Sequence, residues 1–180
     1  PLSAATFRGV ALELADTHPA LGAVVSTWGI PEFWSRPPGF ASLALFIVEQ
    51  QVSLASAKAV FERVAAAIGG MTPELVAAAD PDTLGQAGLT RQKQRYLIGL
   101  AEVIESGELD LDVLATEPDG AARDRLLAIT GIGPWTADVY LLSALRRPDI
   151  WPVGDRALQV GVGEVLGVAT PEPHSMDGLA

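Results

Sequence analysis

The sequence predicts an all-α protein. Apolar residues recur at the three- and four-residue spacing of amphipathic helices through most of the 180 residues. Glycine and proline separate these segments, and no alternating pattern typical of a strand runs for more than four residues. A hydrophobic content of 49% can fill one core, which predicts a single domain over residues 1–180, arranged as two small lobes.

In the N-terminal half, helices are predicted from apolar periodicity and from start and stop signals. The first covers residues 6–16, and two strongly apolar helices follow within residues 39–70, meeting around residues 50–53. Thr72 suits the N-cap of the next helix. Pro73 suits its first position, because the N–H that proline lacks would be unpaired there.

In the C-terminal half, the same signals predict five helices. They lie within residues 89–107, over 110–116, over 118–129, from Trp135 onward and from Asp155 onward.

The charge distribution leaves two interpretations of the surface open. A net charge of -10 argues against a nucleic-acid partner, since phosphate binding depends on Lys and Arg. Much of that charge is concentrated in residues 102–119, which hold seven acids and no base, directly after Arg91, Lys93 and Arg95. The protein therefore has either a bipolar surface or basic residues scattered over an acidic one.

Composition excludes several classes of site. The chain has no cysteine, which excludes disulfides, thiolate zinc sites and iron–sulfur clusters, and its two histidines are far apart in sequence. Any metal must therefore be bound by oxygen. No run of about 18 apolar residues and no secretory leader pattern is found, so we expect a cytoplasmic protein that does not contact a membrane.

The stretch ITGIGPWTADVY, residues 129–140, predicts a hairpin between two helices, with the whole unit at about residues 123–145. Gly131 and Gly133 would let the backbone approach a ligand closely. The unpaired N–H groups at the start of the second helix suit a phosphate, including one in a DNA backbone. An ordinary tight turn between antiparallel helices explains the same residues.

ITGIGPWTADVYLL closely resembles the helix-hairpin-helix of the endonuclease III superfamily of DNA glycosylases. WPVGDRAL also matches that family, and it places Asp155 22 residues after Gly133. Two further stretches agree, RPPGFASLALFIVEQQVSLASAKAVFERV and GLTRQKQRYLIGLAEVIESGELDL, so the resemblance covers roughly residues 36–168. It is strongest to the alkylpurine branch, the 3-methyladenine DNA glycosylase II type.

The resemblance implies a two-lobed helical fold with the active-site cleft between the lobes. It implies base excision repair of double-stranded DNA by a monomer associated with the bacterial nucleoid. Alkylated purines such as 3-methyladenine and 7-methylguanine would be flipped out and hydrolysed from the sugar. The extra N-terminal domain of some relatives is not expected here, and a last helix of the family after Ala180 would be missing.

The resemblance also assigns roles to residues of the candidate active site. Asp155 would stabilise the oxocarbenium-like transition state, whereas the sequence without the resemblance favours an N-cap role alone, and one residue can do both. Trp135 stands where lyase-active relatives have a nucleophilic Lys, so no lyase activity is expected. Trp135 and Gln50 would contact the flipped base, although plain packing at the start of a core helix also explains Trp135. Gln51 would be the wedge that fills the gap in the duplex, unless both glutamines simply mark a polar helix junction.

The resemblance further implies contacts to the DNA backbone. No cofactor is expected to be required, although a structural Na⁺ or K⁺ at the hairpin would be held by the main-chain carbonyls of Leu127, Ile129 and Ile132. The rival interpretations are a non-catalytic DNA-binding protein and a glycosylase for another damaged or mispaired base. The expected phosphate-binding residues are Gly131, Gly133, Thr136, Arg91 and Lys93.

Overall fold

A computed structural model of the protein describes residues 1–176, and these residues form helices and no strands. The all-α class is therefore confirmed. The helices are α1 (Ala4–Thr17), α2 (Pro19–Trp28), α3 (Phe40–Glu49), α4 (Leu54–Ile68), α5 (Pro73–Ala77), α6 (Pro81–Gln86), α7 (Arg91–Glu105), α8 (Leu111–Thr116), α9 (Asp119–Leu127), α10 (Pro134–Val139), the π-helical turn η1 (Tyr140–Ala144), α11 (Arg156–Leu166) and α12 (Pro173–Met176).

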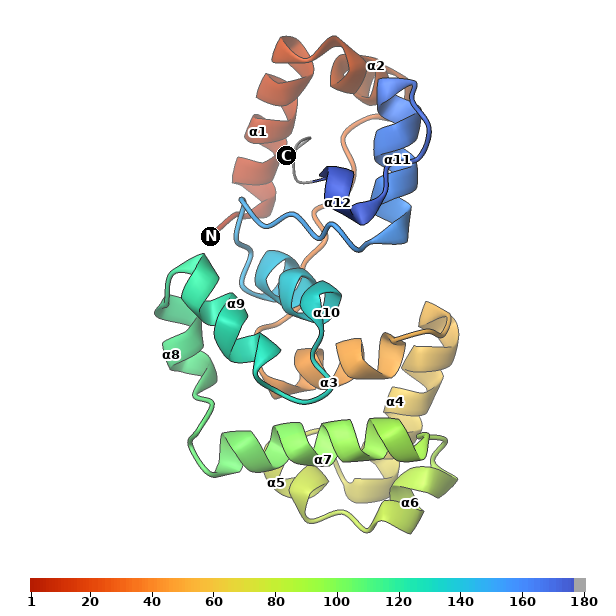
Figure 1. Cartoon of the computed structure of the whole chain (residues 1–180), viewed down its shortest axis with the longest axis vertical. Helices are drawn as coiled ribbons and strands as arrows, with labels where there is room; N and C mark the ends of the chain where they lie inside the picture. The colour runs from red at the N-terminus through yellow and green to blue at the C-terminus, as the bar shows by residue number, and fades with distance from the viewer. Residues whose placement is uncertain (177–180) are drawn as a thin grey trace.

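The helices divide into two lobes (Figure 1). One lobe contains α3 to α7, with α7 packed against α5, α3 and α6. The other contains α1, α2, α11 and α12, with α2 in contact with both α1 and α11. The helices α8 to α10 lie between them, and α10 contacts α9 and α3. The extended segments 29–39 and 145–155 run between the lobes.

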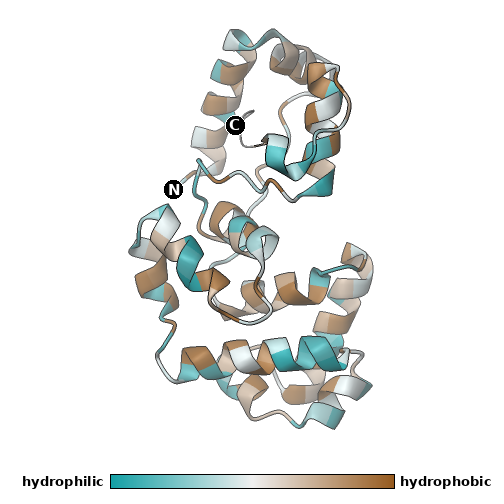
Figure 2. Cartoon of the chain, in the orientation of Figure 1, coloured by the Kyte–Doolittle hydropathy of each residue, from teal (hydrophilic) through white to brown (hydrophobic). Residues whose placement is uncertain are grey.

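The core is centred on α3, α7 and the helix that runs through α10 into η1. Phe46, Ile47, Leu97, Leu100 and Tyr140 are fully buried there. Brown segments on the facing sides of these helices show the same distribution (Figure 2). By contrast, no residue of α1 or α2 is buried, so the N-terminal helices cover the outside of their lobe.

Most helix starts follow the predicted chemistry. Thr72 caps α5 with Pro73 at its first position, and Asp155 caps α11, as expected. Sequence reasoning missed α2, α6, α12 and the π-helical turn. In that turn the N–H of Leu145 donates to the carbonyl of Tyr140, five residues earlier, rather than four.

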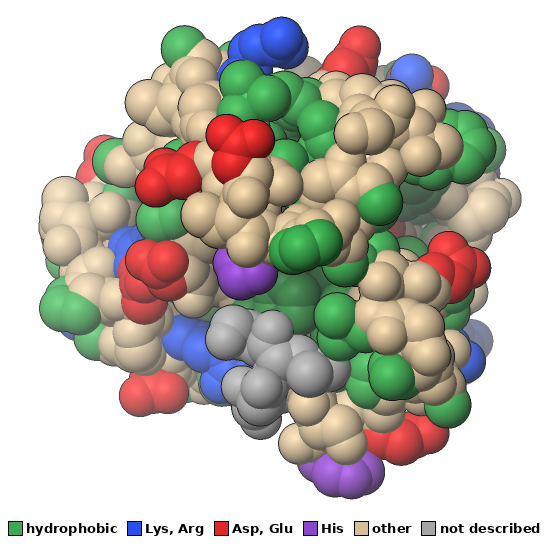
Figure 3. Space-filling view, turned by 90° about the horizontal axis from the view of Figure 1, so that it is seen from above, with side chains coloured by type: hydrophobic (Ala, Val, Ile, Leu, Met, Phe, Trp, Pro, Cys, Tyr) green, Lys and Arg blue, Asp and Glu red, His purple; other side chains and the backbone are tan. Residues whose placement is uncertain are grey.

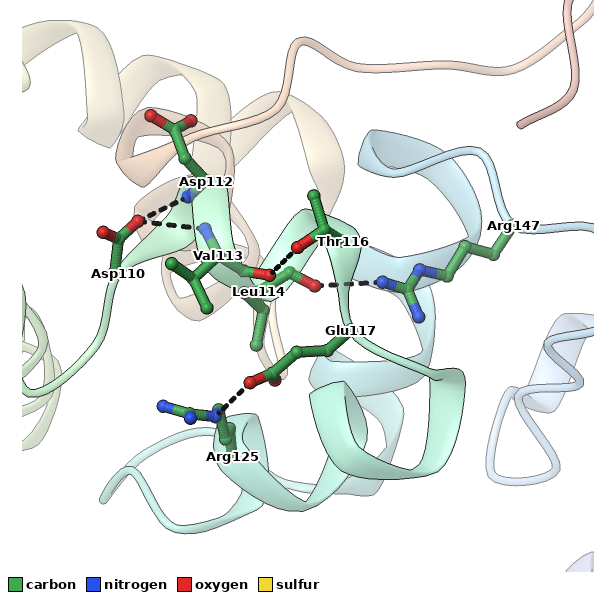
Figure 4. A network of polar contacts seen from close by, with 8 residues as sticks. All are labelled: Asp110, Asp112, Val113, Leu114, Thr116, Glu117, Arg125 and Arg147. Atoms are coloured by element: carbon green, nitrogen blue, oxygen red, sulfur yellow. Dashed lines mark hydrogen bonds and ion pairs between the residues drawn. The ribbon is translucent and has the colours of Figure 1, made fainter.

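The acidic segment 102–119 folds into its own network of contacts (Figure 4). Asp110 caps α8 by accepting from the N–H groups of Asp112 and Val113, and Glu117 pairs with Arg125 at 2.8 Å. Arg147 donates to the carbonyl of Leu114 at 3.0 Å. Part of the negative charge of this segment is therefore offset locally.

Acidic side chains are not confined to that segment. Viewed from the α1–α2–α11 end, Asp and Glu side chains are spread around the face of the molecule (Figure 3). Within residues 1–176, no helix has the length and apolar character needed to span a bilayer.

Candidate functional site

A cleft of about 930 Å³ opens where α3, α7, the hairpin before α10 and the start of α11 meet. Each of these elements was singled out in the sequence for a different reason, and the fold brings them to one place. The lining residues are Glu49, Gln50, Gln51, Gln92, Lys93, Tyr96, Gly131, Ile132, Gly133, Pro134, Trp135, Thr136, Gly154 and Arg156.

The two hairpin glycines differ in whether the surrounding structure requires a glycine at their positions. Gly131 has φ of 97°, in the left-handed region, and a Cβ there would collide with the Tyr96 ring. Gly133 has an ordinary extended conformation, and a Cβ there would meet no atom within 4 Å. Packing therefore requires the first glycine, whereas nothing in the protein itself requires the second.

Gln50 joins the end of α3 to the hairpin. Its side-chain Nε2 donates to the carbonyl of Gly131 at 2.9 Å and to the hydroxyl of Thr136 at 3.0 Å. Thr136 is only 2% exposed, so its hydroxyl is committed to this contact. A phosphate contact from Thr136 would therefore use its backbone N–H rather than its hydroxyl.

Gln51 lies at the exposed tip of the turn between α3 and α4. Its φ of 59° is left-handed, which is uncommon for a residue other than glycine and is a form of backbone strain found at functional turns. Lys93 stabilises this turn, because its Nζ donates to the carbonyls of Val48 at 2.7 Å and Gln50 at 2.9 Å. Desolvation by burial lowers the pKa of Lys93 from its ordinary value.

Trp135 and Asp155 are joined by a hydrogen bond. The indole Nε1 donates to Oδ2 of Asp155 at 2.8 Å, and the backbone N–H of Leu158 donates to Oδ1 at 2.9 Å. Asp155 is thus an N-cap, as one interpretation expected, and it accepts a second hydrogen bond from Trp135, although Asp155 itself is not among the residues that line the cleft. It is partly buried, and it lies between two lining residues, Gly154 and Arg156.

An aromatic and charged cluster continues from Trp135 into α3. The Trp135 ring meets Phe46 edge-on, with centroids 6.5 Å apart, and the Arg36 guanidinium lies 4.7 Å from the Phe46 centroid. Arg36 pairs with Glu49 at 2.7 Å. Sequence reasoning missed Glu49, and it also missed Tyr96. Neither residue belongs to a recognisable sequence motif, and each is identified as a site residue only by its contacts in the fold.

The predicted backbone-binding residues are only partly brought together. Lys93 lines the cleft, whereas Arg91 does not. The carbonyl of Ile129 accepts from the N–H of Ile132 at 3.0 Å, while the carbonyls of Leu127 and Ile132 receive no hydrogen bond from the described residues. Within residues 1–176, no cluster of His, Cys, Asp and Glu side chains could hold a metal.

No residue of the acidic segment 102–119 lines the cleft. Of the charged residues that do, Lys93 and Arg156 are basic and Glu49 is acidic. The segment that dominates the net charge is therefore separated from the site, and the basic start of α7 reaches it.

Comparison with known proteins identifies the family of this arrangement. Residues 44–177 match the HhH-GPD superfamily of base excision DNA repair proteins, a range that includes the hairpin, the cleft and Asp155. The chain belongs to the HhH-GPD superfamily. The resemblance inferred from four stretches of sequence is thereby confirmed.

Curated relatives of this HhH-GPD protein include glycosylases for alkylated bases. The DNA-3-methyladenine glycosylase of Bacillus subtilis is 31% identical over 142 residues, which is 72% of this chain and 45% of that protein. The endonuclease III of Sulfolobus acidocaldarius is 35% identical over 111 residues, or 59% of this chain and 48% of that protein. The chain thus spans about half the length of these relatives.

Solved HhH-GPD structures agree with the fold. The DNA-3-methyladenine glycosidase of Bacillus halodurans superposes with a TM-score of 0.79 at 31% identity, covering 92% of this chain and 78% of that one. The 3-methyladenine DNA glycosylase of Schizosaccharomyces pombe, solved with abasic DNA, gives a TM-score of 0.81 at 22% identity, covering 92% and 84%. At that identity the second similarity supports the fold alone.

Proposed function

We propose that the protein is a monofunctional DNA glycosylase that releases alkylated purines of the 3-methyladenine and 7-methylguanine type from double-stranded DNA. The observation that carries this proposal is the convergence, on one cleft of an HhH-GPD protein, of the glycine-containing hairpin, the strained turn at Gln51 and Trp135, whose indole N–H is hydrogen-bonded to Asp155. It would act as a monomer in the cytoplasm, at the nucleoid.

DNA would be held through its backbone at the hairpin. The N–H groups at the start of α10 have no helical partners, and Gly133 leaves room for a phosphate to approach them. Lys93, with an N–H not used by the two carbonyls, and Arg156 would add positive charge. Na⁺ or K⁺ on the carbonyls of Leu127, Ile129 and Ile132 would supply further charge at the hairpin.

The damaged nucleotide would then be flipped into the cleft, with Gln51 filling the space that it leaves. Flipping costs a few kcal/mol, and an inserted side chain offsets part of that cost. The exposed tip and the firm attachment of its backbone through Lys93 and Gln50 support this role. Trp135 would offer its ring to the base, where cation–π attraction favours a positively charged purine.

Asp155 would be the catalytic residue of the hydrolysis. Cleavage of the N-glycosidic bond develops positive charge on the sugar, which a nearby carboxylate stabilises, and the same carboxylate would accept a proton from the attacking water. A purine alkylated at N3 or N7 is already a cation and leaves without protonation, so one carboxylate suffices. Trp135 and Leu158 fix the orientation of both oxygens.

Strand scission is not expected from this site. The residue after Pro134 is Trp135, which has no amine to form a Schiff base with the sugar. Lys93 is the lysine that lines the described cleft, and its ammonium is bound by two carbonyls.

The direct test is incubation of the protein with methylated and with untreated duplex DNA, followed by chromatography of the released bases and electrophoresis of the strands. We expect free 3-methyladenine or 7-methylguanine from the methylated DNA only, with no strand scission before alkali is added. Scission by the wild type would contradict the monofunctional assignment, and a Lys93→Met variant would show whether Lys93 is responsible.

A second candidate function is excision of another damaged or mispaired base, which the identity to an endonuclease III favours. A panel of duplexes with oxidised, deaminated and mismatched bases distinguishes the two. Binding without release of any base would instead support a non-catalytic DNA-binding protein.

Gln51→Ala tests the wedge. We expect excision from paired duplex to slow about tenfold, because nothing would then fill the gap in the stack, while excision from single-stranded DNA stays unchanged. Rates on matched single- and double-stranded oligonucleotides check this. Equal slowing on both substrates would argue against a wedge.

A further inference from the structure

Glu49 is a buried carboxylate in the cleft that the proposed reaction does not use. It is the last residue of α3, directly before Gln50, and its side chain is 7% exposed. It nevertheless lines the cleft together with Trp135. A carboxylate is rarely buried unless its oxygens are satisfied, so the partners of each oxygen are informative.

The two oxygens of Glu49 have different surroundings. Oε1 accepts a hydrogen bond from Nη2 of Arg36 at 2.7 Å. Oε2 receives none from the described residues, and yet it is not sealed from solvent. The sealed side-chain atom without a partner in the described part of the chain is Oε2 of Glu117 instead. Oε2 of Glu49 is therefore an acceptor open to the cleft.

The neighbours of Glu49 hold that acceptor in place. Arg36 is fixed by the faces of Phe46 and Trp34, at 4.7 and 5.9 Å from the two ring centroids, and Phe46 contacts Trp135. A continuous chain of contacts therefore joins Glu49 to the Trp135–Asp155 pair, and Glu49 and Trp135 are its members that line the cleft.

The charge of Glu49 is largely compensated. Arg36 pairs with it directly, and the ammonium of Lys93 is bound to the carbonyls of the two flanking residues, Val48 and Gln50. Attraction of a cationic base by net charge is therefore weak at this position. What remains is a directional acceptor, which selects a ligand by its N–H donors.

We propose that Glu49 is a specificity-determining residue that accepts a hydrogen bond from the flipped base, and that it selects purines with an N–H donor on the Watson–Crick edge. This inference rests on the proposed glycosylase function. The 6-amino group of 3-methyladenine and the N1–H and 2-amino groups of 7-methylguanine meet this requirement. The base 1,N6-ethenoadenine does not, because its added ring joins N1 to N6 and leaves no N–H on the 6-amino nitrogen.

The test compares the wild type with Glu49→Gln. Glutamine keeps the size of the side chain and a carbonyl oxygen for Arg36, but it turns an NH₂ donor toward the cleft. We expect the ratio of 7-methylguanine to 1,N6-ethenoadenine excision rates in duplex DNA to fall at least about tenfold. The matched control is Glu117→Gln, a half-buried and ion-paired glutamate outside the cleft, which should leave the ratio unchanged.

A second measurement avoids DNA and base flipping. Free 7-methylguanine should inhibit the wild type at least about tenfold more strongly than Glu49→Gln, whereas free 1,N6-ethenoadenine should inhibit both equally. If Glu49→Gln does not fold, as judged by thermal melting, Glu49→Asp takes its place. The shorter carboxylate of Glu49→Asp should weaken inhibition by free 7-methylguanine by the same factor.

The outcomes separate this inference from the proposed function. A wild type that releases no base from methylated DNA would contradict the glycosylase assignment itself. An active wild type whose excision ratio and inhibition constants are unchanged by the Glu49 variants would overturn the role of Glu49 and leave the glycosylase assignment intact.

Discussion

At the scale of single residues, the site depends on side chains that have two tasks. Asp155 begins α11 by capping it and also receives the indole N–H of Trp135. Gln50 ends α3 and bonds the hairpin through Gly131 and Thr136. A residue held by two elements has little freedom to rotate, and such preorganisation is what electrostatic catalysis requires.

The Trp135–Asp155 bond gives the first prediction at this scale. Trp135→Phe removes the donor but keeps a ring against Phe46. Losing one hydrogen bond to a charged group is worth about 1.5–3 kcal/mol, so we expect kcat for base release to fall about tenfold or more. The same loss should lower the free energy of unfolding by about 1.5–3 kcal/mol, whereas the affinity for damaged duplex should stay within a few-fold because a ring is kept.

Trp151→Phe is the matched control, because its indole donates to the carbonyl of Met176 and does not line the cleft. It should leave kcat unchanged. A Trp135→Phe enzyme with wild-type kcat would show that the indole N–H does not position the carboxylate.

Much of the candidate site could be predicted from sequence, but not all of it. Asp155, Trp135 and Gln51 stand in or beside recognisable local patterns. Glu49 could not be predicted as a site residue, because its role depends on its ion pair with Arg36, 13 residues away, and on its position in the cleft. The pairing of Tyr96 with Gly131 is likewise a long-range contact that no local pattern encodes.

At the scale of elements, the hairpin between α9 and α10 is held from three sides. Tyr96 of α7 packs against Gly131, Gln50 of α3 donates to its carbonyl, and Arg123 of α9 pairs with Asp138 of α10 at 2.6 Å. The hairpin is therefore a fixed part of the cleft wall.

The two glycines of the hairpin give opposite predictions. Gly131→Ala combines a left-handed φ with a clash against Tyr96, so we expect a loss of about 3 kcal/mol in the free energy of unfolding. Gly133→Ala meets neither obstacle and should change stability by less than about 0.5 kcal/mol. A methyl group there would obstruct an approaching phosphate, so the affinity for duplex DNA should fall about tenfold.

Urea unfolding and DNA titration of both variants check these values. Wild-type DNA affinity in a stable Gly133→Ala variant would show that the hairpin backbone is not the phosphate contact. Wild-type stability in Gly131→Ala would contradict the packing of Tyr96.

Helix positions were predictable where caps and apolar stripes coincide, as at α5 and α11. The helix α2 was missed because it starts at Pro19, with only His18 between it and the end of α1, and a proline there was interpreted only as the stop signal of the preceding helix. The π-helical turn was missed because its sequence continues an apolar helix, and the change of hydrogen bonding follows from tertiary packing.

At the scale of the whole molecule, the protein combines a net charge of -10 with a proposed polyanionic partner. The acidic segment lies outside the cleft, and two of its acids, Glu117 and Asp119, are paired with arginines. Lys93 and Arg156 are the basic residues that line the cleft. The electrostatic contribution to DNA binding should therefore be local and small.

The salt dependence of DNA binding tests this distribution. If Arg156 contacts one phosphate, Arg156→Ala should make the slope of log K against log salt shallower by about one unit. Arg8→Ala, at an exposed position on α1 outside the cleft, should leave the slope unchanged. Equal effects of the two variants would mean that only the overall charge matters.

The most direct test of Asp155 as the catalytic carboxylate compares the wild type with Asp155→Asn. The single-turnover rate of base release from methylated duplex DNA is measured for both proteins, and their binding is measured on the same DNA. Asparagine keeps the size of the side chain but removes the negative charge that would stabilise the sugar cation. We predict that release of 3-methyladenine and 7-methylguanine is lost while affinity stays within a few-fold. Equal rates for the two proteins would contradict the assignment of Asp155 as the catalytic carboxylate.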